Sequence, residues 1–252
     1  MTGFLFVTDL DRTLVGDDNA LKTLNQQLTD HRQKYGTKIV YATGRSLFLY
    51  RQLISQQSLL PPDALITSVG SEIYFNPNED IFDSEWAEII AHGWNRSQVI
   101  SIAGNFSYLT HQPRSEQGLF KISYHLSDSV ASVVLPQLKL ALHESGLDVK
   151  LIYSGGKDLD ILPQKADKGL AVEFLRQKWR IDEINTVVCG DSGNDISLFM
   201  VENLRGIIVG NAMSELREWH EANPSDIRYI STGKYAAGII EGLQYFRFIL
   251  FS

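Results

Sequence analysis

A short and continuously apolar run, residues 4–8, lies near the start of the sequence and ends directly at Asp9. A run of this length without polar alternation is typical of a strand that is covered on both faces, as in a parallel sheet. Residues 20–32 then place leucines at helical spacing, and residues 38–42 form a second apolar run. Strand, helix and strand in this order predict right-handed βαβ units, and therefore the α/β class.

The middle of the chain follows a different pattern, in which short helical stretches are grouped with strands of alternating polarity. In order, the expected elements are two short helices from about residue 83, a strand over residues 120–125, a helix over 133–142, and strands over 149–153 and 157–162. Alternation of this kind indicates an antiparallel sheet with one solvated face. The α/β pattern resumes with a helix over residues 168–179 and a buried strand over 186–189.

We therefore expect one α/β core that is built from both ends of the chain and interrupted by a smaller α+β insertion. The expected core has a Rossmann-like parallel sheet and occupies residues 1–79 and 161–252, and the insertion occupies residues 80–160. We find no internal repeats, and 44% of the 252 residues are hydrophobic, which is enough to bury a core in each part.

The composition excludes several broad classes of protein. Lys and Arg number 23 against 30 Asp and Glu, a net charge of −7, whereas a general nucleic-acid binder needs clustered cations. No apolar stretch approaches the roughly 20 residues that span a bilayer, and residues 4–7 are too short for a signal-peptide core. The single cysteine, Cys189, excludes an intramolecular disulfide and a multi-cysteine zinc site. We expect a cytoplasmic protein that binds neither nucleic acid nor membrane.

Ligands of open α/β sheets bind at the carboxyl ends of the strands, and the first expected strand ends at a pair of aspartates. Asp9 and Asp11 are two residues apart, so both carboxylates can flank one crevice. Carboxylates beside a hydrophobic strand repel each other and lose hydration, unless a divalent cation or a shared proton relieves them. The pair favours a metal site, although helix capping or turn formation would use the same residues.

Two further positions favour an anion. The second strand is followed by Thr43 and Gly44 and then by a helix, so a hydroxyl, a permissive glycine and free backbone N–H groups can hold a phosphate there. Lys168 stands at the start of a predicted helix, where it opposes the helix dipole unless an anion lies nearby. Taken alone, Ser46 is just as plausible as an ordinary N-cap, and Lys168 would be interpreted as a solvated surface lysine.

The strand at residues 186–189 leads into a segment rich in oxygen-bearing side chains. Asp191, Asn194 and Asp195 stand at positions i, i+3 and i+4, so one helical turn can gather them on one side. Hard oxygen ligands of this kind suit Mg²⁺, which is commonly held by one or two carboxylates together with a substrate phosphate. The pattern predicts a metal site, with loop capping as the alternative.

Together, these four positions resemble the four motifs of the haloacid dehalogenase (HAD) superfamily of phosphatases. The matching segments are residues 9–13, Thr43, Lys168 and residues 190–195, and the insertion resembles the C2-type cap of that superfamily. The resemblance covers the whole chain. A closer resemblance, to the sucrose-6-phosphate phosphatase family and its stand-alone cyanobacterial type, is carried by residues 41–46, 69–74, 121–125 and 154–163.

The resemblance implies a covalent mechanism with Mg²⁺ as the cofactor. Asp9 would attack phosphorus to form an aspartyl phosphate, and Asp11 would act as acid and base while its backbone carbonyl binds the metal. Thr43 and Lys168 would bind the oxygens of the transferring phosphoryl group. The implied residues are Asp9, Asp11, Thr43 and Lys168 for catalysis, and Asp9, Asp11 and Asp191, supported by Asn194 and Asp195, for the metal.

The same resemblance implies hydrolysis of sucrose-6-phosphate to sucrose and phosphate, the final step of sucrose synthesis, by a monomer that could associate with sucrose-phosphate synthase. Asp158 and Asp160 share one face of their strand, and carboxylates accept sugar hydroxyl hydrogens well; the solvated face of an edge strand is the competing interpretation. The implied substrate-binding residues are Gly44, Arg45, Ser71, Glu72, Lys121, Tyr124, His125, Lys157, Asp158 and Asp160.

Three alternatives stay open. A metal-dependent glycosyltransferase also uses a D-x-D motif, but we expect a nucleotide-binding region before that motif, and eight residues precede Asp9. An inactive regulatory domain of the kind attached to sucrose-phosphate synthases should lack the pair Asp9 and Asp11. Among the phosphatases, glucosylglycerol phosphate or mannosylglycerate phosphate is the alternative substrate.

Overall fold

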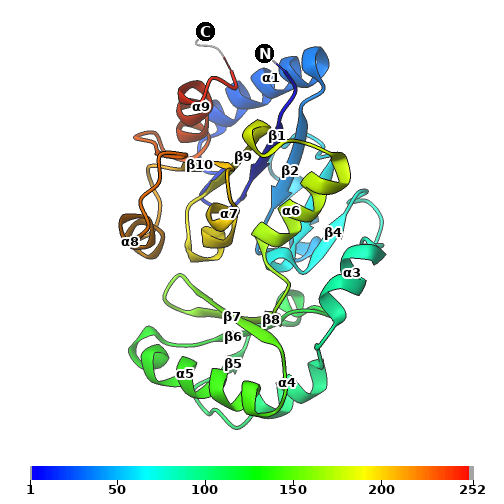
Figure 1. Cartoon of the computed structure of the whole chain (residues 1–252), viewed down its shortest axis with the longest axis vertical. Coiled ribbons are helices and arrows are strands. Elements are labelled where there is room, and N and C mark those ends of the chain that lie inside the picture. The colour runs from blue at the N-terminus through cyan, green and yellow to red at the C-terminus, as the bar shows by residue number, and fades with distance from the viewer. Residues whose placement is uncertain (1, 250–252) are drawn as a thin grey trace.

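The computed structural model describes residues 2–249, which form two lobes, each built around its own sheet (Figure 1). The larger lobe has a seven-stranded sheet in the order β11-β10-β9-β1-β2-β3-β4, and only β3 and β4 are paired antiparallel. Its strands are β1 (Leu5–Thr8), β2 (Lys38–Ala42), β3 (Ala64–Thr67), β4 (Glu72–Tyr74), β9 (Thr186–Gly190), β10 (Arg205–Ile208) and β11 (Arg228–Ile230). Strands from the two ends of the sequence thus share one sheet.

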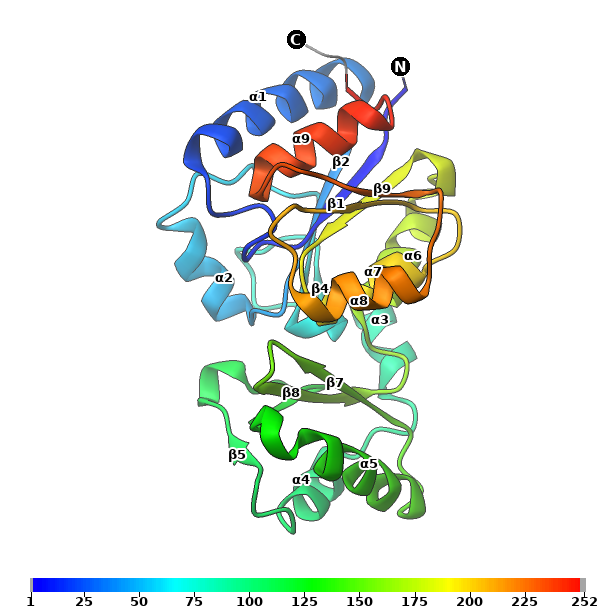
Figure 2. The same ribbon diagram turned by 90° about the vertical axis from the view of Figure 1, so that its left-hand side faces the viewer.

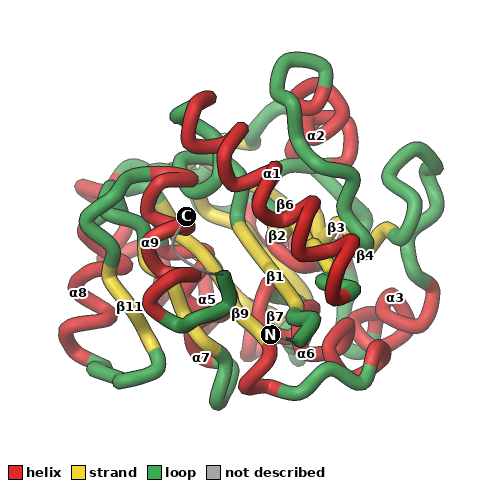
Figure 3. Tube along the Cα trace, turned by 90° about the horizontal axis from the view of Figure 1, so that it is seen from above, coloured by secondary structure: helices red, strands yellow, loops and turns green. Residues whose placement is uncertain are grey.

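Helices cover both faces of this sheet (Figure 3). One face packs against α1 (Asp18–Tyr35), α2 (Leu47–Ile54) and α9 (Tyr235–Tyr245), and the other against α3 (Ser84–Ala91), α6 (Lys168–Trp179), α7 (Ile196–Met200) and α8 (Ser214–Ala222). Along β1, Phe6 joins the first hydrophobic cluster, whereas Leu5 and Val7 join the second. The run is apolar at successive positions because both faces of β1 are buried.

The smaller lobe is a four-stranded antiparallel sheet in the order β5-β6-β8-β7, with helices on one face (Figure 2). Its elements are α4 (Arg96–Ala103), β5 (Thr110–His111), β6 (Ile122–His125), α5 (Asp128–Glu144), β7 (Val149–Ser154) and β8 (Asp158–Pro163). Val99 of α4 and Leu138 of α5 pack against Ile161 of β8 in a separate hydrophobic cluster. The opposite face of the sheet is turned toward the larger lobe.

The predicted fold class is confirmed: the core is α/β with a mainly parallel sheet, and the strands of the smaller lobe lie between β4 and β9 in the sequence. The predicted limits of the insertion, residues 80 and 160, stay a prediction, and β8 itself runs on to Pro163. The short 3-10 helices are η1 (Ser68–Gly70), η2 (Arg114–Glu116), η3 (Glu183–Asn185) and η4 (Gly193–Asp195). Within residues 2–249, we find no helix with the length and apolar character that crossing a membrane requires.

Candidate active site

Three neighbouring strands of the core sheet end at polar residues. β1 lies between β9 and β2, and Thr8 is in register with both Cys189 and Tyr41. Asp9, Thr43 and Asp191 directly follow these three strands, and all three side chains are buried. Because parallel strands end at the same edge of a sheet, residues that are distant in the sequence meet at one place.

Asp9, Asp191 and Asp195 form a buried acidic cluster in which one oxygen of each carboxylate lies within 4.8 Å of the others. Burial, together with repulsion from Asp195 and Asp191, raises the pKa of Asp9 well above its ordinary value. Burial followed by repulsion from Asp195 raises the pKa of Asp191 to about 7. Three hard oxygen donors at this separation can hold a divalent cation, which would balance their charge.

Lys168, the first residue of α6, reaches into this acidic cluster. Its side chain is fully buried, and its Nζ donates hydrogen bonds of 2.7 Å to Oδ1 of Asp9 and 2.7 Å to Oδ1 of Asp195. Burial alone would lower the pKa of Lys168, but the charges of Asp195 and Asp9 outweigh burial and raise it. Lys168 is therefore a buried ammonium, and the alternative of a solvated surface lysine is wrong.

Asp195 holds the loop that carries Asp191. While its Oδ1 binds Lys168, its Oδ2 accepts backbone hydrogen bonds from Asp191 at 2.9 Å and from Ser192 at 3.0 Å. Asp191 in turn accepts hydrogen bonds from Thr13 Oγ1 at 3.1 Å and from Arg12 Nε at 3.2 Å. The carboxylate of Asp195 thus has fixed partners on both oxygens.

The loop after β2 leads directly into the capped start of α2. Thr43 is fully buried, and its Oγ1 accepts the backbone N–H of Arg45 at 3.1 Å. Ser46 is the N-cap of α2, because its Oγ accepts the N–H of Leu49 at 3.4 Å. The N-cap interpretation of Ser46 is therefore right, and Gly44 lies close to the loop after β9, since a Cβ placed on it would be 3.5 Å from Nδ2 of Asn194.

Asp11 is turned toward Arg45. The guanidinium of Arg45 donates to both carboxylate oxygens of Asp11, with Nε and Nη2 each at 2.7 Å. Asp11 is about half exposed, at 48% of its side-chain surface, in contrast to the buried Asp9. The two aspartates of the D-x-D motif thus have different partners: a buried lysine for Asp9 and a partly buried arginine for Asp11.

A cavity of about 720 Å³ lies between the two lobes and reaches these residues. From the core it is lined by Asp9, Asp11, Arg12, Gly44, Arg45, Leu49, Asp191, Ser192, Asn194 and Met213, and from the smaller lobe by Gln112, Glu116, Lys121, Ser154, Gly155, Lys157, Asp158 and Asp160. The core side of the cavity carries carboxylates and guanidinium groups, and the other side is formed by polar side chains of the smaller lobe, of which Lys121 and Asp160 are buried.

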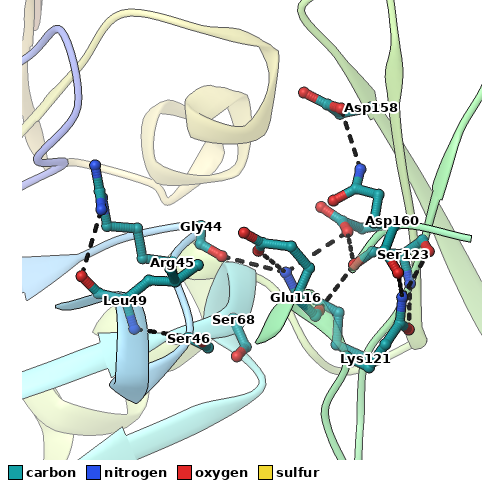
Figure 4. A network of polar contacts seen from close by, with 12 residues as sticks. Gly44, Arg45, Ser46, Leu49, Ser68, Glu116, Lys121, Ser123, Asp158 and Asp160 are labelled. Atoms are coloured by element: carbon teal, nitrogen blue, oxygen red, sulfur yellow. Dashed lines mark hydrogen bonds and ion pairs between the residues drawn. The ribbon is translucent and has the colours of Figure 1, made fainter. Parts of the chain in front are cut away.

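A connected polar network forms the wall that belongs to the smaller lobe (Figure 4). Lys121 is 2% exposed, and its Nζ donates to the carbonyl of Gly44 in the core at 3.2 Å. The same ammonium lies 3.6 Å from Glu116 and 3.7 Å from Asp160, which also accepts a 2.5 Å hydrogen bond from Ser123. Lys121 therefore joins the two lobes at the edge of the loop after β2.

Four of the predicted substrate-binding residues do not line the cavity. Ser71 donates to the carbonyl of Ser68, and Glu72 is buried and accepts hydrogen bonds from Thr67 and Tyr74. Tyr124 is 1% exposed, and its ring is tilted against that of His111 with 4.4 Å between the ring centroids, whereas His125 is exposed and hydrogen-bonded to Asp158 at 3.2 Å. Tyr124 pairs with Leu159 across the sheet, so it belongs to the face that packs on the helices.

Sequence reasoning missed several residues of the cavity wall. Arg12 lines the cavity and lies within the first motif, next to the buried Thr13, and both side chains hydrogen-bond Asp191. Gln112 and Glu116 come from a segment with little regular structure, where spacing predicts no orientation. Gln112 donates to Asp158 at 3.1 Å, so it extends the polar wall.

Known proteins resemble this chain over nearly all of its length. The chain is 39% identical over 251 residues to probable sucrose-phosphatase 2 of Arabidopsis thaliana, covering 96% of this chain and 59% of that protein. It is 32% identical over 241 residues to the mannosylfructose-phosphate phosphatase of Agrobacterium fabrum, covering 96% of both. The X-ray structure of the sucrose-phosphatase of Synechocystis sp. PCC6803, in complex with sucrose and phosphate, matches with a TM-score of 0.91 and 40% identity over 98% of this chain and 99% of that one.

The plant relative is longer than this chain, which spans 59% of its length. The family model described as sucrose-6F-phosphate phosphohydrolase matches residues 2–247. That match covers both lobes and every residue of the acidic cluster, Asp9, Asp191 and Asp195. The chain therefore belongs to the sucrose-6F-phosphate phosphohydrolase family, within the HAD superfamily.

Proposed function

We propose that this protein is a Mg²⁺-dependent phosphatase that hydrolyses sucrose-6-phosphate to sucrose and inorganic phosphate. The observation that carries the proposal is the contact between Asp9 and the buried Lys168, at the floor of a cavity whose other wall is polar. A carboxylate nucleophile beside a fixed cation suits attack on a phosphate monoester, because the cation offsets repulsion between two anions. The family and the sucrose-phosphatase relatives support the same reaction.

The donor set fits Mg²⁺. Three buried carboxylates surround a single ammonium, so the cluster has an excess of negative charge that a divalent cation would balance. Asp9 and Asp191 would hold the ion with the backbone carbonyl of Asp11, whereas Asp195 would support it by fixing the loop, since both of its oxygens are hydrogen-bonded. Bound there, the ion would orient the nucleophile and neutralise charge on the phosphate.

The chemistry then proceeds in two displacements. A carboxylate oxygen of Asp9 attacks phosphorus, the bond from phosphorus to the sugar oxygen breaks, and Asp11 gives a proton to that oxygen. A water molecule next attacks the aspartyl phosphate, Asp11 takes the proton of that water, and the carboxylate of Asp9 leaves. Thr43 and Lys168 bind the oxygens of the transferring group, where charge develops. Asp11 must leave Arg45 before it can act.

The wall of the smaller lobe is suited to a neutral sugar. Asp158 and Asp160 present carboxylates to the cavity, and Lys121 and Lys157 add donors beside them. A sugar has many hydroxyl groups and no charge. Fixed hydrogen-bond donors and acceptors therefore select it by the positions of its hydroxyl groups. We assign the recognition of the sucrose part to this wall and the phosphate part to the core.

A substrate screen tests the proposal. The full chain is incubated with sucrose-6-phosphate, mannosylfructose phosphate, glucosylglycerol phosphate, mannosylglycerate phosphate and p-nitrophenyl phosphate, with Mg²⁺ or with EDTA, and released phosphate is measured. We expect the highest kcat/KM for sucrose-6-phosphate and no release in EDTA. A clear preference for another glycosyl phosphate would refute the substrate, and no release from any ester would refute the phosphatase.

A further inference from the structure

The turn between β3 and β4 has an unusual backbone. Ser68, Val69 and Gly70 follow one another with φ values of 52°, 59° and 96°. A β-branched residue in the left-handed region is a genuine outlier, and its backbone is strained. Surrounding structure must therefore hold this turn in place. Ser68 and Val69 are each 1% exposed, and neither lines the cavity.

One side of the turn holds the loop after β2. The backbone N–H of Val69 donates to the carbonyl of Thr43 at 3.1 Å, and the N–H of Ser68 donates to the carbonyl of Arg45 at 2.8 Å. These two carbonyls flank Gly44, and a Cβ placed on Gly44 would lie 3.9 Å from Cγ2 of Val69. The turn thus fixes the backbone on both sides of the residue that faces the cavity.

The other side of the turn packs against the start of α6. A Cβ placed on Gly70 would lie 2.1 Å from the carbonyl carbon of Asp167 and 2.6 Å from the backbone nitrogen of Lys168. No side chain fits between Gly70 and this peptide, so the turn and the start of α6 are in direct backbone contact. The carbonyl of Gly70 accepts a 3.0 Å hydrogen bond from Nε1 of Trp86, which is 3% exposed in α3.

We propose that the turn Ser68–Gly70 is a positioning element that sets the separation between the loop Thr43–Arg45 and the start of α6, so that Thr43 and Lys168 address the same phosphate. The inference rests on the proposed function, because it assigns the turn to that site. The left-handed conformation directs the backbone N–H groups of Ser68 and Val69 toward the loop Thr43–Arg45. It also keeps Gly70 in direct backbone contact with the Asp167 peptide. A displacement of about 1 Å at a reacting group can lower the rate about 100-fold, so a strained but accurate turn has a catalytic use.

Gly70→Ala tests the inference, with Gly36→Ala as its matched control. Both glycines have a positive φ, 96° and 75°, but nothing lies within 4 Å of a Cβ on Gly36. Both variants therefore carry backbone strain. Only in Gly70→Ala does the added methyl group collide with the backbone of Asp167 and Lys168. With p-nitrophenyl phosphate and Mg²⁺, at a temperature where circular dichroism shows both variants folded, we expect kcat to fall at least about tenfold in Gly70→Ala and to stay unchanged in Gly36→Ala.

A second pair of variants covers the case in which Gly70→Ala does not fold. Trp86→Phe removes the hydrogen bond to Gly70, and Trp94→Phe removes a bond of equal length, 3.0 Å, to the carbonyl of Leu119 in the smaller lobe. We expect a lower kcat and a weaker inhibition by inorganic phosphate in Trp86→Phe, and neither change in Trp94→Phe. A purely structural role would lower the melting temperature in both without changing kcat of the folded enzyme.

Unchanged kcat in folded Gly70→Ala, or in Trp86→Phe, would overturn the inference. If the wild-type protein released no phosphate from any ester, the proposed function would fail, and the crystal structures of the wild type and a folded variant would then decide the inference. In the wild type, Nζ of Lys168 lies 2.7 Å from Oδ1 of Asp9. The inference requires that contact to lengthen in Gly70→Ala or Trp86→Phe, and an unchanged contact in either variant would refute it.

Discussion

Arg45 binds both carboxylate oxygens of Asp11, with two N···O distances of 2.7 Å, at the wall of the cavity between the lobes. A bidentate pair of this kind fixes the orientation of the carboxylate relative to the guanidinium. An acid that donates a proton to a leaving group must be released from such a pair. The contact therefore describes a resting arrangement, in which Arg45 also brings a guanidinium to the wall of the cavity.

The first prediction separates the roles of Arg45 and Asp11. Asp11→Asn should lower kcat by about 10²–10⁴-fold, because it removes the proton donor and acceptor. Arg45→Ala should mainly raise KM, because it removes a cation from the cavity but leaves Asp11 free. Steady-state kinetics of both single variants and the double variant with sucrose-6-phosphate measure these effects. A loss of kcat in Arg45→Ala as large as that in Asp11→Asn would contradict this division.

The second prediction concerns Lys168. Lys168→Met should lower kcat by about 10²–10³-fold, because in the proposed mechanism it removes the ammonium that would bind the phosphate oxygens. It should also lower the free energy of unfolding by about 3–5 kcal/mol, because Asp9 and Asp195 lose a buried partner. Lys139→Met, at an exposed position of α5, is the control and should change neither quantity. Near-wild-type turnover by Lys168→Met would show that the buried ammonium is not part of the catalytic machinery.

The third prediction is that Mg²⁺ stabilises the folded protein. A ligand present at about 100 times its Kd adds about 2.7 kcal/mol to the free energy of unfolding, which corresponds to a rise in Tm of about 5–10 °C for a chain of this size. Differential scanning calorimetry with Mg²⁺ and with EDTA measures the shift. Asp191→Asn should remove most of the Mg²⁺-dependent rise in Tm. The control variant Asp30→Asn, at an exposed position, should retain that rise. A shift that survives in Asp191→Asn would place the ion elsewhere.

The fourth prediction tests sugar recognition by the smaller lobe. Asp158→Ala should lower kcat/KM for sucrose-6-phosphate far more than for p-nitrophenyl phosphate, because only the first substrate has hydroxyl groups to place against this wall. Removing a hydrogen-bonded carboxylate at such a site costs about 1.5–3 kcal/mol, or roughly 10- to 100-fold in kcat/KM. Equal losses of kcat/KM with both substrates would argue that Asp158 supports the fold or the chemistry and does not bind the sugar.

The position of the site could be predicted because parallel strands end at one edge. Apolar runs showed where β1, β2 and β9 lie, and the residues that directly follow them, Asp9, Thr43 and Asp191, meet in the structure. Lys168 could be predicted from a different principle, since a cation at a helix start needs an anion. In each case a rule about local geometry was sufficient to bring together residues from distant parts of the chain.

The smaller lobe was less predictable, because alternation assigns residues to two faces but does not say which face meets the cavity. Lys121 directly precedes β6, and Tyr124 lies within it. The two residues are three positions apart, so their side chains lie on opposite faces of the sheet and cannot both line the cavity. Only the packing of Tyr124 against His111 and the helices decides between the faces. Gln112 lies in a loop and Glu116 ends the three-residue 3-10 helix η2, which is too short to show a period in the sequence.

Ser71 and Glu72 show a further limit of sequence reasoning. Their segment is one of those that carry the resemblance to the phosphatase family. Their side chains, however, are hydrogen-bonded to Ser68, Thr67 and Tyr74 and do not face the cavity. A motif identifies a segment that matters without telling whether it touches the substrate or holds another residue that does. Long-range contacts, such as that of Gly70 with the Asp167 peptide, determine which of the two roles a segment has. Such contacts cannot be recognised from the spacing or polarity of residues in the sequence.

The measurement that tests the proposed chemistry most directly is phosphate release from sucrose-6-phosphate by Asp9→Asn in the presence of Mg²⁺, with Asn at the exposed Asp18 as the control. The amide keeps the size of the side chain and removes one of the mutually repelling charges of the acidic cluster, so the variant should fold and melt no lower than the wild type in EDTA. We predict no release above background from Asp9→Asn and full activity in the control. Sustained turnover by folded Asp9→Asn would contradict the assignment of Asp9 as the nucleophile.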